Sequence, residues 1–198
     1  AIEATLGMTL GHRGRPAIRR AALAAAGMLV LRLGLMVVAL LDYSGVISNP
    51  AVFMPPLERA VDATSLWLLI WALLPLFSRV PQWGDLLAGA GLLLLVVLYV
   101  FFAVAWYDEA GGMTVTPPYN ASYQNAFWEV VQLVLLGAAL IYVLAVRSGD
   151  WALQLGILLV LSAAHLVHLS WGPNSGNVAG WVRLGQLVAY PLLTVGAY

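Results

Sequence analysis

The sequence predicts an all-α bundle of six helices that cross a membrane. Of its 198 residues, 62% are hydrophobic and only 9% are charged, whereas soluble domains carry about 25% charged residues. A spanning helix needs roughly 20 mainly apolar residues, and six runs of the chain come close to that length. None of the runs alternates apolar and polar residues as a barrel strand would. We therefore expect a polytopic transmembrane bundle.

The bundle is expected to occupy residues 21–198, with the six runs at 21–42, 58–77, 85–106, 126–146, 151–170 and 181–198. The first run has a single charge in its middle, Arg32, and the second has its charges at 58–62. The third is uncharged after Asp85, the fourth contains Glu129, and the last two are uncharged except for Arg183. Such sparse charge favours helices in lipid over helices in water.

Residues 1–20 have two interpretations. They form a cytoplasmic N-terminal segment, or they are the end of a preceding helix that would make the intact bundle seven-helical. We expect the chain to be part of a longer protein, because its last apolar run has no flanking charge.

The arginines predict the orientation of the bundle. They precede the first run and follow the second and the fourth, at Arg13, Arg15, Arg19, Arg20, Arg79 and Arg147. The connections at 43–57, 107–125 and 171–180 carry no arginine or lysine. Short connections that contain arginine stay in the cytoplasm. Both termini are therefore expected to be cytoplasmic, in the inner membrane of a bacterium, with the longer loops outside.

Composition excludes several function classes. The chain has no cysteine, so it has neither disulfides nor thiolate metal sites. It also has no lysine, which a retinal Schiff base requires. Its basic and acidic residues balance, which leaves no overall positive field to attract nucleic acid. No nucleophile–base or phosphate-binding motif is present, so we expect no enzymatic activity, catalytic residue, metal or cofactor for this chain.

Polar residues inside the runs gather toward the predicted outer ends of four helices. Glu58 and Asp62 are four residues apart, and His165 and His168 are three apart, so each pair shares a helix face. A charge that faces lipid costs several kcal/mol, so these faces should meet other helices. We expect them to line an extracytoplasmic pocket whose ligand-binding residues are Glu58, Asp62, Trp67, Glu129, Gln132, His165, His168, Arg183 and Gln186.

Two contacts are predicted in particular. Arg32 lies too deep to reach water cheaply, and Asp62 is the carboxylate best matched in depth, so the two should form a structural ion pair. His168 lies nearer the outer surface than His165 and should face the pocket, in contact with Glu129 or with the surroundings of Arg183.

Less specific interpretations stay open. Charged side chains within a turn of the interface can simply reach water, which applies to Glu58, Arg59, Glu129 and Arg183. The histidines can serve as hydrogen-bond partners between helices, one of them can hold a haem or a pigment, or both can bind zinc with Glu129 as a third ligand. A transporter is a further alternative.

Three blocks of the chain resemble a known family. They are MPPLERAVDATSLWLLIWAL at 54–73, AHLVHL at 164–169 and GWVRLGQLVAYPLL at 180–193, and they are similar to the N-terminal membrane domains of bacterial, Chloroflexi-like sensor histidine kinases. The resemblance implies a sensory input domain whose last helix, with Pro191, leads toward a cytoplasmic kinase module.

From the pocket and the resemblance together we expect a receptor domain that binds a small ligand or senses protons and signals through its last helix. Its expected partners are the lipid bilayer, a small-molecule ligand and a second copy joined through the downstream module. The alternatives are a haem- or pigment-binding subunit of an electron-transfer complex and a small-molecule transporter.

Overall fold

The computed structural model describes residues 16–47, 49–74, 81–113, 115–147, 150–171 and 176–195. Six α-helices account for most of them: α2 (Pro16–Tyr43), α3 (Pro50–Leu73), α5 (Pro81–Ala110), α6 (Tyr123–Val146), α7 (Trp151–Trp171) and α8 (Gly180–Val195), together with a short 3-10 helix, η1 (Tyr119–Ala121). No strand occurs among the described residues. The predicted all-α fold is confirmed.

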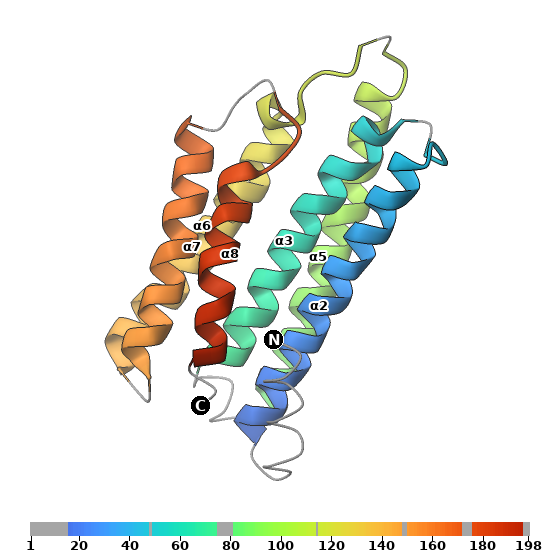
Figure 1. Ribbon diagram of the computed structural model, residues 1–198. Coiled ribbons are helices and arrows are strands. Elements are labelled where there is room, and N and C mark those ends of the chain that lie inside the picture. The colour runs from blue at the N-terminus through green and yellow to red at the C-terminus, as the bar shows by residue number, and fades with distance from the viewer. Residues whose placement is uncertain are drawn as a thin grey trace.

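The helices form two groups of three (Figure 1). In the first group α3 packs against α2 and α5, in the second α7 packs against α6 and α8, and α3 meets α6 between the groups. The helices run alternately up and down, so that α2, α5 and α7 end where η1 lies (Figure 1). We call this the η1 end of the bundle, and we call the two groups its halves.

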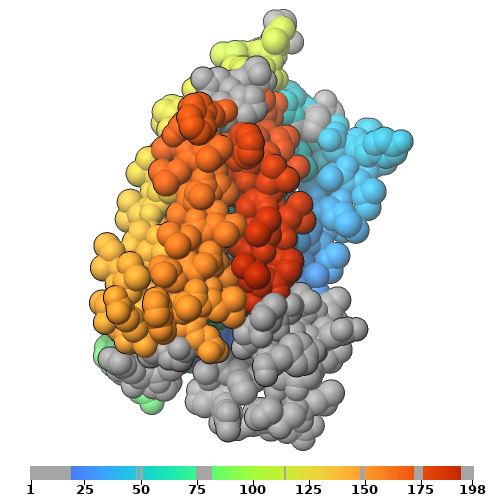
Figure 2. Space-filling view, turned by 60° about the vertical axis from the view of Figure 1, so that its left-hand side comes forward, coloured from blue at the N-terminus to red at the C-terminus, as the bar shows by residue number. Residues whose placement is uncertain are grey.

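Four of the helices are long and apolar enough to cross a membrane: Arg19–Tyr43, Gln82–Ala110, Tyr123–Val146 and Trp151–Trp171. The other two differ for separate reasons. The described part of α8 has 16 residues, fewer than the roughly 20 that span the hydrocarbon core. α3 is long enough but carries Glu58, Arg59 and Asp62, all of which are buried. α3 is thus enclosed by other helices, and Figure 2 shows α7 and α8 covering one face of the bundle with α2 beside α8.

The start of α3 differs from the prediction, because the helix begins at Pro50 and not at residue 58. Pro55 and Pro56 lie inside it, and proline usually interrupts a helix because it has no backbone N–H. Pro55 therefore leaves the carbonyl of Ala51 without its helical donor. The indole Nε1 of Trp106 on α5 donates to that oxygen at 3.2 Å. The neighbouring helix thus replaces the hydrogen bond that Pro55 removes.

The other boundaries shift by a few residues. α5 is extended at both ends relative to 85–106, and α6 begins three residues before the predicted 126. The predicted helix at 58–77 ends at Leu73, followed by Leu74 in an extended conformation, and residues 75–77 lie outside the described part. Most of the predicted N-terminal segment 1–20 and the last residues, 196–198, also lie outside it.

Away from the η1 end the two halves meet through apolar side chains. Leu69, Leu136 and Leu158, from α3, α6 and α7, are almost completely buried in one cluster. Lipid tails are as apolar as these side chains, so close packing and not water exclusion must hold helices together there.

Close packing also occurs within one half, between α7 and α8. A Cβ at Gly185 on α8 would overlap the Cβ of Ala164 on α7.

Candidate functional site

Polar contacts between the halves join α2, α3 and α8 around Asp62. Arg32 Nη2 donates to Asp62 Oδ1 at 2.7 Å and to Gln186 Oε1 at 2.8 Å, and Gln186 Nε2 donates to Asp62 Oδ1 at 3.0 Å. The Asp62 side chain is 1% exposed and that of Arg32 is 29% exposed. The structure therefore contains the Arg32–Asp62 contact that the sequence predicts, and it adds Gln186 as a partner of both.

A second ion pair links α3 to α8 nearer the η1 end. Arg183 Nε donates to Glu58 Oε1 at 2.7 Å. The Glu58 side chain is buried, whereas half of the Arg183 side chain is exposed. α8 is thus tied to α3 by two polar residues three positions apart, Arg183 and Gln186, which lie on the same face of the helix.

Arg59 is the least expected member of the polar cluster. Its side chain is completely buried, and it donates from Nε to Asn125 Oδ1 at 2.7 Å and from Nη2 to Asn120 Oδ1 at 2.6 Å. Glu58 Oε2 lies 3.8 Å from Nη1, and Nη1 has no hydrogen-bond partner among the described residues. A guanidinium in the core of the bundle is held mainly by two neutral amides.

The loop before α6 closes over this arginine. The ring of Tyr119 lies 5.9 Å from Arg59 Cζ, and the backbone N–H of Tyr119 donates to Asn177 Oδ1 at 2.7 Å. Burial raises the pKa of the Tyr119 phenol above its usual range, and the nearby positive charge of Arg59 partly opposes that shift. Tyr119 therefore stays neutral beside the guanidinium.

Glu129 joins α6 to α7. Its Oε2 lies 2.7 Å from His165 Nδ1, and its Oε1 lies 3.9 Å from His168 Nε2. All three side chains are buried. His165 is hydrogen-bonded, whereas neither ring nitrogen of His168 has a hydrogen-bond partner among the described residues. The predicted neighbourhood of His168 and Glu129 is present, at a distance longer than a hydrogen bond.

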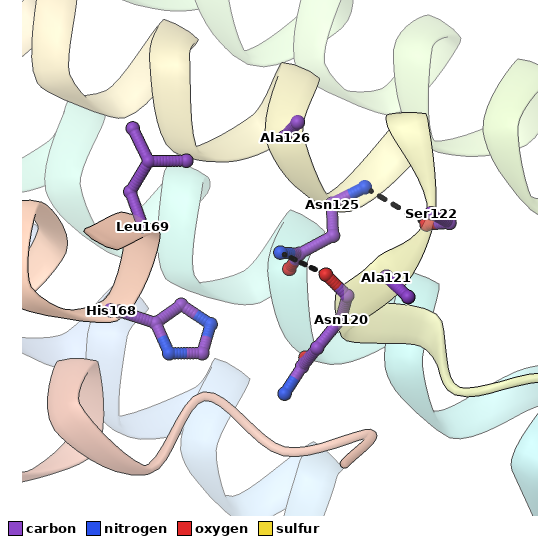
Figure 3. A pocket seen from close by; sticks show the side chains of 7 residues that line it. All are labelled: Asn120, Ala121, Ser122, Asn125, Ala126, His168 and Leu169. Atoms are coloured by element: carbon purple, nitrogen blue, oxygen red, sulfur yellow. Dashed lines mark hydrogen bonds between the residues drawn. The ribbon is translucent and has the colours of Figure 1, made fainter. Parts of the chain in front are cut away.

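A cavity of about 240 Å³ lies beside His168. Figure 3 shows the residues that line it, which come from η1, the first turn of α6 and the end of α7: Asn120, Ala121, Ser122, Asn125, Ala126, His168 and Leu169. Two of these residues, Asn120 and Asn125, are the amides that hold Arg59. The cavity and the buried arginine therefore share a wall.

The structure places the nine predicted binding residues in different surroundings. Of the nine, only His168 lines the cavity, and Glu129 lies behind it. Glu58, Asp62, Arg183 and Gln186 connect helices, His165 binds Glu129, and Gln132 donates to the carbonyl of Trp128 at 3.3 Å. Trp67 faces α5, where its Nε1 donates to Ala88 O at 3.0 Å and its ring leaves no room for a side chain at Gly91.

Sequence reasoning missed Arg59, Asn120 and Asn125. It left open that Arg59 reaches water at the interface, and the two asparagines lie in η1 and the first turn of α6, more than 60 residues later in the chain. One local signal was available. Ser122 is the N-cap of α6 and accepts from Asn125 N at 3.2 Å, and a serine three residues before a polar side chain indicates such a helix start.

We compared the chain with known proteins in three ways, by family, by sequence and by structure. No family, characterised protein or solved structure matches it. The function can therefore be inferred only from the chemistry of the site.

The geometry of the site can be compared with the needs of a zinc site, a haem or pigment site, and a transporter. In the described part of the chain, no three His, Cys, Asp or Glu side chains are placed to hold a metal ion, so zinc gains no support. The cavity of about 240 Å³ is smaller than the about 300–1,000 Å³ of sites for drug-sized ligands, and a haem or chlorophyll is larger still. A transporter needs a polar path, whereas Leu69, Leu136 and Leu158 fill the region beyond the polar cluster.

Proposed function

We propose that this chain is the membrane-embedded input domain of a bacterial signalling protein, and that it binds a small polar ligand in the cavity at the η1 end. The proposal is supported by two residues that line the cavity and also bind the buried arginine. Asn120 and Asn125 line the cavity, and they also accept the hydrogen bonds of Arg59, a buried residue of α3. A ligand that contacts these amides changes the surroundings of a buried charge on the central helix.

A route from the cavity to α8 follows from the polar contacts. Arg59 Nη1 lies 3.8 Å from Glu58 Oε2, and Glu58 Oε1 binds Arg183 on α8 at 2.7 Å. A ligand that draws the asparagines away would favour a closer Arg59–Glu58 pair and weaken the bond to α8. α8 corresponds to the block GWVRLGQLVAYPLL, which in the similar sensor kinases leads to the cytoplasmic modules.

The test begins with the purified protein in detergent, screened by thermal unfolding against small polar metabolites. A ligand that raises the unfolding midpoint is then tested by spin labelling, which is straightforward because the chain has no cysteine. Cysteines at Val188 on α8 and Val37 on α2, both exposed, report the distance between the two halves. A pair at Val37 and Val96 on α5, also exposed, is the control within one half.

We expect the ligand to shift the Val188–Val37 distance and to leave the Val37–Val96 distance unchanged. A ligand that binds in the cavity and changes neither distance would contradict the signalling role. A screen without any cavity ligand would contradict the receptor role itself.

A further inference from the structure

We infer that the ligand of this cavity is a small anion of the carboxylate type, held between the first turn of α6 and the imidazole of His168. The inference rests on the proposed function, since it assigns a chemical class to the same site. Three features of the cavity carry it: the helix terminus, the histidine and the buried arginine behind the wall.

The cavity lies at the N-terminus of a long helix. Ser122, Asn125 and Ala126 belong to its lining, and they are the N-cap and part of the first turn of the 24-residue helix α6. The N-terminus of a helix carries a partial positive charge, which suits an anion, while the backbone N–H groups of these three residues are bonded within the chain, to Tyr119 O, Ser122 Oγ and Ser122 O. The first turn of α6 contains no acidic residue, so no side chain of that turn supplies the complementary negative charge.

His168 is the independent feature that points to a ligand. Its side chain is 1% exposed, it lines the cavity, and neither ring nitrogen is hydrogen-bonded within the described structure. Figure 3 shows the ring turned toward Asn120 across the cavity. Buried polar groups are nearly always hydrogen-bonded. A ligand oxygen in the cavity would accept from a ring N–H, while Glu129 Oε1 lies 3.9 Å from Nε2, beyond hydrogen-bond distance.

Arg59 adds positive charge behind the cavity wall. The side-chain oxygens of Asn120 and Asn125 point at its guanidinium, so the amides turn their nitrogen ends away from it. None of the seven lining residues carries a carboxylate, which a bound cation would need. Glu58, Asp62 and Glu129 are acidic groups on the neighbouring helices: Glu58 accepts from Arg183, Asp62 Oδ1 accepts from Arg32 and Gln186, and Glu129 Oε2 is bonded to His165. Asp62 Oδ2 and Glu129 Oε1 have no hydrogen-bond partner within the described structure, but neither residue lines the cavity. The surroundings therefore favour a negative ligand over a positive one.

Three small probes of similar size distinguish the possible ligand charges: acetate, acetamide and methylammonium. Binding to the purified full chain in detergent is measured by calorimetry and by the unfolding midpoint, at constant pH and ionic strength in chloride. We expect saturable binding of acetate and none of methylammonium. Acetamide should bind at least about tenfold more weakly, because a hydrogen bond to a charged group is worth about 1.5–3 kcal/mol and each 1.4 kcal/mol is a factor of ten.

Two variants locate the binding. His168→Gln should weaken acetate about tenfold or more by the same reasoning. Ala126→Phe fills the cavity without removing a polar group, because Ala126 lines it, and should abolish binding. Ala138→Phe is the matched control, since Ala138 is an exposed alanine on the same helix, and it should bind acetate normally.

Each other result has a defined meaning. Acetamide binding that exceeds acetate binding and is lost in Ala126→Phe overturns the anion but keeps the cavity as a ligand site. Acetate binding that persists in both cavity variants overturns the site. No saturable binding of acetate also overturns the anion, while the proposed function is then decided separately by the metabolite screen.

Discussion

Asp62 is the residue whose replacement tests the polar junction most directly. It accepts from Arg32 at 2.7 Å and from Gln186 at 3.0 Å, so it connects α3 to both α2 and α8. Asp62→Asn removes the negative charge and keeps the size and one acceptor oxygen. The variant therefore isolates the electrostatic part of the junction from its packing.

The expected cost follows from the burial of the two partners. Removing one member of a buried ion pair costs about 3–5 kcal/mol, because the other charge is left uncompensated. Asp62 is 1% exposed, and the 29% exposed part of Arg32 lies in the middle of its apolar run, where it faces lipid and not water, so neither charge is compensated when its partner is removed. We expect Asp62→Asn and Arg32→Gln each to cost about 3–5 kcal/mol. The double variant should cost less than the sum of the two.

The assay is reversible unfolding in mixed detergent micelles, followed by the loss of helical circular dichroism, for the parent chain, both single variants and the double variant. Glu58→Gln is the comparison, because its partner Arg183 is 51% exposed and exposed pairs contribute about 1 kcal/mol or less. Additive single and double effects, or a larger cost for Glu58→Gln than for Asp62→Asn, would refute the reasoning from burial.

Three further predictions concern other parts of the bundle. Arg59→Lys should destabilise the chain by about 2 kcal/mol, because one ammonium group cannot reach both asparagines as the planar guanidinium does; hydrogen exchange at η1 should accelerate, and unchanged exchange would count against the role of Arg59. Gly185→Val should separate α7 from α8 and lower the unfolding midpoint, whereas Gly156→Val, with no neighbour near a Cβ, should have only the small effect of a β-branched residue in a helix; equal losses would contradict the close approach. Cysteines at Val115 and Arg147, both exposed, should react with an impermeant reagent from opposite sides of the membrane, Val115 from outside, and labelling of both from one side would overturn the predicted orientation.

Much of the fold could be predicted from the sequence, because a helix in lipid must satisfy its own backbone and so shows its length as an apolar run. The start of α3 was missed for a specific reason. Pro55 and Pro56 indicate a loop, and the donor that makes the helix possible, Trp106, lies about 50 residues later on α5. No sequence pattern near residue 50 indicates the contact with Trp106.

The site was predicted less completely, and depth explains the difference. Arg32 lies far from both ends of its run, so its need for a carboxylate can be inferred from sequence. Arg59 lies near a predicted helix end, where sequence alone cannot distinguish water from protein. Its partners Asn120 and Asn125 lie in η1 and the first turn of α6, and which of the residues there reach α3 depends on tertiary packing.

The uneven placement of the polar contacts has a mechanical consequence. The hydrogen bonds of Arg59 and Arg183 lie toward the η1 end and those of Asp62 lie near the middle of α3, whereas the apolar cluster that contains Leu69 and Val143 lies toward the other end. Hydrogen bonds fix the relative orientation of two helices more strictly than apolar contacts do. We therefore expect any tilt between the halves to pivot toward the η1 end. A 24-residue helix such as α6 is about 36 Å long at 1.5 Å per residue, so a tilt of about 5° at the pivot moves its far end by about 3 Å.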